Sequence, residues 1–222
     1  MCWNKEVSII TYITVMVMVI ILFKRNSGPD RHIALFSGIF VTIQLLEFFI
    51  WLSIENNNRT LNDYMTRLVL IFLWAQPLAN TFMAYKGATN FKARSILMFL
   101  LIVFILLFLV SLVNSIGGFK FESDKGGNCH LVWKRKINED SSELKSGFNF
   151  MANHPSMTFI YILGLFIPLL FIKPLKKGIL LSVVGLLLLI ISRKMSSQEE
   201  FSSWWCWIAG IFTLVALLYK TS

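Results

Sequence analysis

Residues 95–116 read SILMFLLIVFILLFLVSLVNSI, and this unbroken apolar run indicates the fold class. The run contains no acidic or basic side chain. Its length matches the roughly 20 residues that an α-helix needs to cross a hydrocarbon layer about 30 Å thick. A backbone in lipid must satisfy its own hydrogen bonds, so the run predicts a transmembrane helix.

The rest of the chain repeats this pattern. Of 222 residues, 56% are hydrophobic and 15% are charged, whereas about a quarter of the residues of a soluble domain are charged. We therefore predict an all-α, polytopic bundle of seven transmembrane helices that forms one domain over residues 1–222. The predicted helices cover residues 7–23, 33–54, 68–85, 95–116, 157–172, 179–192 and 204–219, and residues 117–156 form an external connector.

The distribution of basic residues predicts the orientation. The connectors 24–32, 86–94 and 173–178 are six to nine residues long, and with the C-terminus they hold ten basic residues and one acidic residue. Short basic connectors stay on the cytosolic side, which places the N-terminus outside and the C-terminus in the cytosol. Topology thereby accounts for most of the net charge of +9. We expect contacts of this cytosolic face with anionic lipids and no nucleic-acid partner.

Features that suit an oxidising, external side fall on the opposite side of the membrane. The sequence Asn58-Arg59-Thr60 is a glycosylation sequon beside a helix end. All three cysteines lie on this side, and we expect Cys129 to pair with Cys2 or with Cys206; the alternative is three unpaired thiols. Most of the tryptophans also lie near the outer helix ends, where they form either an aromatic belt or the lining of a vestibule.

One buried group is the candidate functional centre. Glu47 is the only acidic or basic side chain inside a predicted span, where an ionisable group is costly. Gln44, Glu47 and Trp51 share one face of their helix. On the next helix Gln76 lies at the same level as Glu47, and Asn80 follows Gln76 one turn later. The candidate binding site therefore combines these five side chains. Glu47 has two interpretations, a functional group or a protonated carboxyl that joins two helices through Gln76.

Known motifs of catalysis are absent. The chain has no nucleophile elbow, no His-Glu-x-x-His and no Cys-x-x-Cys. His32 falls on the opposite side from His130 and His154, so the histidines predict no metal site. We expect no catalytic residue and no cofactor. The favoured function is binding or transport of a small molecule, ion or lipid through a polar site in the outer leaflet. The alternatives are a structural or assembly role, as in a viral envelope, and, third, an intramembrane enzyme.

Several short stretches together resemble a known group of sequences. They are Met1-Cys2-Trp3, Lys24-Arg25-Asn26, Gln44-Leu45-Leu46-Glu47, Trp74-Ala75-Gln76-Pro77 and Trp205-Cys206-Trp207. In these stretches, which extend over nearly the whole chain, the sequence resembles a small family of uncharacterised heptahelical membrane proteins of protists and large DNA viruses. The resemblance implies a seven-helix fold and no particular activity.

Overall fold

The computed structural model describes residues 4–116, 120–127, 130–136, 144–146, 155–197, 200–208 and 210–219. Five of its helices are long and apolar enough to span a membrane. They are α1 (Lys5–Arg25), α2 (Asp30–Glu55), α3 (Arg59–Gly87), α4 (Phe91–Ile116) and α7 (Leu175–Met195). Each contains a predicted span and extends beyond it, α3 by more than two turns at its start. The all-α bundle is confirmed.

The other two predicted spans are shorter apolar segments. One consists of α6 (Pro155–Phe166) and the 3-10 helix η1 (Pro168–Phe171). Pro168 has no N–H to donate to the carbonyl of Gly164, so the α-helical ladder ends before it. The other consists of α8 (Phe201–Ile208) and α9 (Gly210–Leu218).

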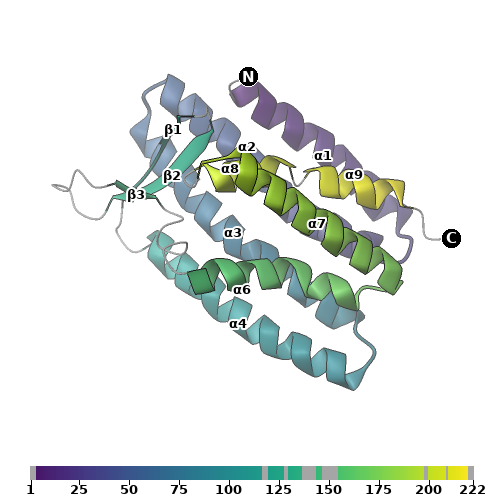
Figure 1. Cartoon of the computed structure of the whole chain (residues 1–222). Helices are drawn as coiled ribbons and strands as arrows, with labels where there is room; N and C mark the ends of the chain where they lie inside the picture. Colours follow the sequence, from purple (N-terminus) through teal and green to yellow (C-terminus); the bar gives the residue numbers. More distant parts are fainter. Residues whose placement is uncertain are drawn as a thin grey trace.

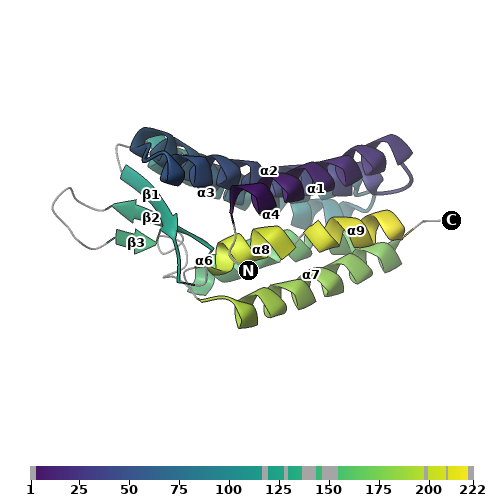
Figure 2. The ribbon, with the colours of Figure 1, turned by 90° about the horizontal axis from the view of Figure 1, so that it is seen from above.

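The helices form two layers, which Figure 2 shows edge-on. Helices α1 to α4 lie side by side in chain order in one layer, and α6, α7, α8 and α9 form the second (Figure 1). The layers approach each other closely at Gly164 of α6, because a Cβ there would lie 2.3 Å from Phe104 of α4 and 2.6 Å from Pro77 of α3.

Apolar side chains occupy the outside of the bundle as well as its inside. Phe99 and Val113 of α4 are 67% and 68% exposed, and Ile10 of α1 is 62% exposed. In water such continuous apolar faces would be unstable, whereas in a bilayer they are covered by lipid chains. The protein is therefore an integral membrane protein.

The predicted external connector contains a small antiparallel sheet that the sequence analysis missed. Its strands are β1 (Lys120–Lys125), β2 (Leu131–Lys136) and β3 (Leu144–Ser146), in the order β1-β2-β3. The sheet lies at the end of the bundle where α1 and α3 begin, called the sheet end below (Figure 1). The Asn62 side chain accepts from the Ser123 N–H at 2.7 Å and donates to the Ser123 carbonyl at 3.0 Å, so β1 is anchored to α3.

A buried ion cluster joins four helices at the opposite end. The Asp30 carboxylate accepts from Arg25 at 2.5 and 3.0 Å and from Lys177 Nζ at 3.0 Å. Arg25 also donates to the carbonyls of Ala216 and Leu217 at the end of α9. Asp30 and Lys177 are fully buried. Helices α2 and α7 begin earlier than the predicted spans and include Asp30 and Lys177, so Glu47 is not the only ionisable residue buried inside the bundle.

Candidate functional site

The inner face of α2 faces the second layer and presents polar side chains at several levels. Asp30, Ser37, Gln44 and Trp51 recur every seven residues, and Glu47 lies between the last two. A spacing of seven residues is close to two helical turns, so these side chains share one face. All five are buried, and Gln44, Glu47 and Trp51 therefore lie on the buried face of α2.

Glu47 is fully buried about 12 Å below the end of α2 at Glu55, at 1.5 Å per residue. Its Oε2 accepts a hydrogen bond from Gln44 Nε2 at 2.7 Å. Ser203 of α8 lies beside the carboxyl, although the geometry falls short of a regular hydrogen bond. Glu47 Oε1 has no hydrogen-bond partner among the described residues. The carboxyl is thus half-satisfied at the interface of the two layers.

Several polar atoms near Glu47 also lack a hydrogen-bond partner among the described residues. Within the described part of the chain, Gln44 Oε1, Trp51 Nε1 and Ser203 Oγ are buried without a hydrogen-bond partner. Buried polar groups in proteins almost always have a partner, and each one left without costs about 1–3 kcal/mol. Several such atoms around one carboxyl suit a site that takes up water or a small polar ligand.

Gln76 has a different partner from the one predicted. Its Oε1 accepts a short hydrogen bond from the Tyr161 hydroxyl of α6. No hydrogen bond joins Glu47 to Gln76 among the described residues, so the interpretation in which Glu47 joins two helices through Gln76 is not supported. The physical reason is that α6 packs over α3 and brings Tyr161 to the amide. Trp205 and Cys206 of α8 lie between the two, the former close to Tyr161 and the latter close to Glu47.

Asn80 belongs to a separate structural network. Its Nδ2 donates to the carbonyls of Gly164 and Leu165 at 3.2 and 2.9 Å. These carbonyls lie at the end of α6, where Pro168 interrupts the helical ladder. Asn80 Oδ1 lies 2.7 Å from His32 Nε2, which therefore donates to it. Asn80 thus satisfies a broken helix inside the bundle, and it does not join the Glu47 cluster.

A small cavity follows the Glu47 cluster on the same face of α2. Its volume is about 20 Å³, and its lining includes Ser37, Phe40, Trp205, Cys206 and Thr213. A cavity of roughly 10–15 Å³ by this measure is enough for one water molecule, provided that polar partners are present. Ser37 Oγ is such a partner, since it is buried and has no other hydrogen bond among the described residues.

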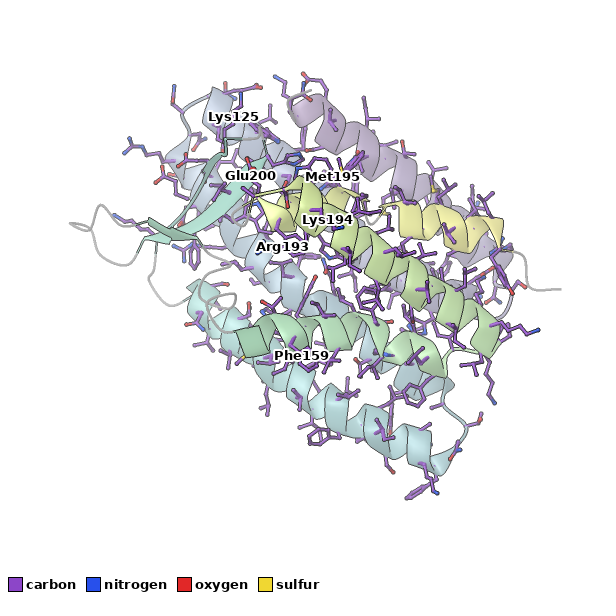
Figure 3. The ribbon with its side chains drawn as sticks, viewed as in Figure 1. Lys125, Phe159, Arg193, Lys194, Met195 and Glu200 are labelled. Atoms are coloured by element: carbon purple, nitrogen blue, oxygen red, sulfur yellow. The ribbon has the colours of Figure 1, made fainter. Side chains whose placement is uncertain are left out.

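The sheet covers the sheet end of α8, next to the Glu47 cluster. His130 stacks on Trp204 with the ring centroids 4.5 Å apart. Glu200, which is labelled in Figure 3, accepts a hydrogen bond from the His130 backbone N–H, with 3.4 Å between Glu200 Oε1 and the nitrogen. Burial lowers the pKa of His130 to about 4, and the Glu200 carboxylate opposes this shift.

The remaining predicted sites are only partly described. Cys206 is a buried free thiol, so its predicted disulfide with Cys129 receives no support. Cys2 and Cys129 lie outside the described residues, and their pairing stays a prediction. Asn58 caps α3 by accepting from the Leu61 N–H at 3.0 Å, and its glycosylation also stays a prediction.

Comparison with known proteins adds no further constraint. No protein-family model matches the chain, and no curated protein is significantly similar to it. The resemblance to the heptahelical family of protists and large DNA viruses stays a prediction. The function therefore has to be argued from the site itself.

Proposed function

We propose that this integral membrane protein binds a proton at Glu47 and uses that site in transport. The observation that supports the proposal is the half-satisfied carboxyl of Glu47, fully buried between α2 and α8. An ionised carboxylate in such a place needs a counter-ion, or it takes up a proton. Ionisable groups at this depth in membrane proteins commonly mark ion pathways and proton relays.

The basic side chains that contact α2 are engaged at its two ends. Lys5 bonds Glu55 at 2.5 Å, and Arg25 and Lys177 bond Asp30. Neither group is near Glu47, which is eight residues from Glu55 and seventeen from Asp30. Among the described residues no basic side chain pairs with Glu47, which supports neutralisation of its carboxyl by a mobile positive charge.

A proton suits the site better than a metal ion does. Hard cations such as Mg²⁺ and Ca²⁺ require about six or more oxygen ligands. Close to Glu47, the described residues supply its own carboxyl, the Gln44 amide oxygen and the Ser203 hydroxyl. A proton needs one acceptor, and the adjacent cavity has room for a water molecule that could exchange it.

The test is proton uptake by purified protein in vesicles that contain a pH-sensitive dye. We expect an imposed pH gradient to dissipate faster with the wild-type protein than with Glu47→Gln, which keeps the shape and loses the titratable proton. Glu55→Gln is the matched control, because Glu55 is on the same helix and its side chain is 44% exposed. Equal flux through wild type and Glu47→Gln would refute the transport proposal.

A structural role is the second candidate, and two hydrogen bonds favour it. The bonds of Gln44 to Glu47 and of Tyr161 to Gln76 both stabilise the interior of the bundle. Such bonds contribute about 0.6–2 kcal/mol in membranes. Infrared difference spectra separate the candidates. If Glu47 only holds the helices together, the infrared band of its carboxyl should not change when the external pH is varied between about 5 and 9.

The orientation of the bundle belongs to the same proposal. We propose that the sheet end faces outside, on the ground that the dense basic connectors lie at the opposite end. Glu47 would then receive protons from the outer side.

A further inference from the structure

A row of side chains that can carry protons runs along the start of α8, from the sheet end towards Glu47. Its members are Ser197, Glu200 and Ser203, called the α8 row below, and they recur every three residues. The Trp204 N–H donates to the Glu200 carbonyl at 3.1 Å, so Glu200 belongs to the first turn of the helix. Side chains three residues apart on a helix are neighbours, with Cβ atoms about 5–6 Å apart. Glu200 and Ser203 therefore lie next to each other.

The inner end of the α8 row is the contact of Ser203 with Glu47. Gln44 donates to Glu47 Oε2 at 2.7 Å, whereas Glu47 Oε1 has no hydrogen-bond partner among the described residues. Ser203 lies beside this carboxyl, is fully buried, and also lacks a regular partner in the described part of the chain. A serine hydroxyl donates one proton and accepts on two lone pairs. Ser203 can therefore give a proton to Glu47 Oε1 and take up another one.

Glu200 is a second buried carboxyl in the protein, and the proposed function has not used it. Its side chain is 1% exposed, under the hairpin of β1 and β2. A Cβ at Gly126 would collide with the carboxyl, so the backbone of the hairpin passes directly over it. The bond from the His130 N–H to Glu200 Oε1 is 3.4 Å long, beyond the usual range of about 2.7–3.2 Å. Oε1 can therefore leave this donor easily and turn towards Ser203.

The outer end of the α8 row is in contact with water. The Ser197 hydroxyl donates to Glu200 Oε2 at 2.9 Å, and Ser197 itself is exposed. A proton from water can therefore reach the buried carboxyl through one hydroxyl. The hairpin covers Glu200 from the side of the sheet, which makes Ser197 the described hydroxyl that joins it to the surface.

We propose that the α8 row passes protons between water at the sheet end and Glu47. The proposal rests on the proton site proposed above and adds the groups that load it. In the loading step the Glu200 carboxyl gives its proton to Ser203 Oγ, while the proton of the Ser203 hydroxyl moves to Glu47 Oε1. One O–H bond breaks at Glu200 and one forms at Glu47. Glu200 then regains a proton from water through Ser197, so atoms and charge balance.

The vesicle assay for proton flux tests the row with variants of its two buried members. Glu200→Gln and Ser203→Ala should each slow the dissipation of a pH gradient by roughly 10²-fold, which is typical for the loss of a positioned proton-transfer group. Glu200→Asp separates transfer from structure. Gln keeps the length and the acceptor oxygen of Glu200, whereas Asp keeps the proton. We therefore expect more flux through Glu200→Asp than through Glu200→Gln, and a structural role predicts the opposite order.

A matched serine provides the control for Ser203→Ala. Ser192 of α7 is fully buried, and its hydroxyl donates to the Leu188 carbonyl of its own helix at 2.9 Å. Ser192→Ala should leave the flux unchanged. The infrared band of the Glu47 carboxyl should still respond to pH at equilibrium in Glu200→Gln and Ser203→Ala, because these variants slow the loading of Glu47 without removing it.

The outcomes distinguish this proposal from the proton site itself. If Glu47→Gln carries the same flux as wild type, the proposed function fails and the α8 row fails with it. If Glu47→Gln abolishes flux while Glu200→Gln and Ser203→Ala behave like Ser192→Ala, the proton site stands and the row is overturned. Loss of the pH response of the Glu47 band in Ser203→Ala would make Ser203 a structural residue and would also overturn the row.

Discussion

The buried ion cluster at the end opposite the sheet makes a sharp prediction for Asp30→Asn. Among the described residues, Asp30 is the carboxylate that pairs with both Arg25 and Lys177, at 2.5 and 3.0 Å. The amide has the same shape and no charge, so two cations would remain without their counter-ion. Lys177 is fully buried and would keep its contacts with Tyr219, whose carbonyl is 3.2 Å away and whose ring centroid is 5.9 Å away.

The expected loss of stability is large. Removing one partner of a buried ion pair costs about 3–5 kcal/mol, because the other charge stays buried and unpaired. This is a sizeable part of a total stability of roughly 5–15 kcal/mol. Glu55→Gln is the matched control. It removes the exposed pair with Lys5, whose side chains are 33% and 44% exposed, and exposed pairs contribute about 0–1 kcal/mol.

Unfolding of the purified protein in mixed micelles, followed by tryptophan fluorescence, measures these losses. The double variant Asp30→Asn, Lys177→Met removes the stranded ammonium and should recover part of the stability. Hydrogen exchange gives a local measurement. Arg25 bonds the carbonyls of Ala216 and Leu217, and in Asp30→Asn it loses the carboxylate that holds it in place. The backbone at the end of α9 should therefore exchange faster in this variant. If Asp30→Asn lost less than about 1 kcal/mol and exchange in α9 did not change, water would be screening the cluster, and our account of it would be refuted.

Two further predictions concern packing and pH. Gly164→Ala should lower stability by about 1–3 kcal/mol through overpacking, because its Cβ would lie 2.3 Å from Phe104; the control Gly38→Ala meets its nearest atom at 3.6 Å, and equal melting temperatures would contradict the prediction. His130 has a pKa lowered to about 4 by burial, so the unfolded state binds more protons below pH 6.5 and stability is lost as pH falls from about 6.5 towards 4. Between pH 7.5 and 5 the loss should be at most about 2 kcal/mol, and thermal melts of His130→Phe should lack this dependence.

The sequence predicted the five long apolar helices because a bilayer imposes one simple condition on a helix that crosses it. A helix in lipid must be apolar over its length and must satisfy its own backbone, and both properties can be read locally. The sheet was missed although local signals existed. Residues 120–125 and 131–136 are two short runs joined by the five residues 126–130, and a short connection that contains Gly126 and Gly127 is a hairpin signal.

The candidate site was harder to predict because its members come from distant segments. The common face of Gln44, Glu47 and Trp51 follows from helical spacing alone. Gln76 and Asn80 find partners on α6. Tyr161, which bonds Gln76, lies 85 residues further along the chain. The ion cluster likewise joins Asp30 to a lysine 147 residues away. No pattern in the sequence encodes such pairings without knowledge of how the two layers pack.

The polar groups inside this bundle differ in how completely they are bonded, and the difference supports the assignment of Glu47. Asp30 accepts from Arg25, Lys177 and the Ser27 N–H, and Asn80 uses both ends of its amide. Those two groups hold helix ends and a broken helix in place, and their bonding is what a structural role requires. Among the described residues, the regular hydrogen bond of Glu47 is the one from Gln44 on its own helix, and Ser203 of α8 lies beside the carboxyl. Glu47→Gln keeps the shape of this side chain and removes its proton, so this variant separates a structural role from the proposed proton site.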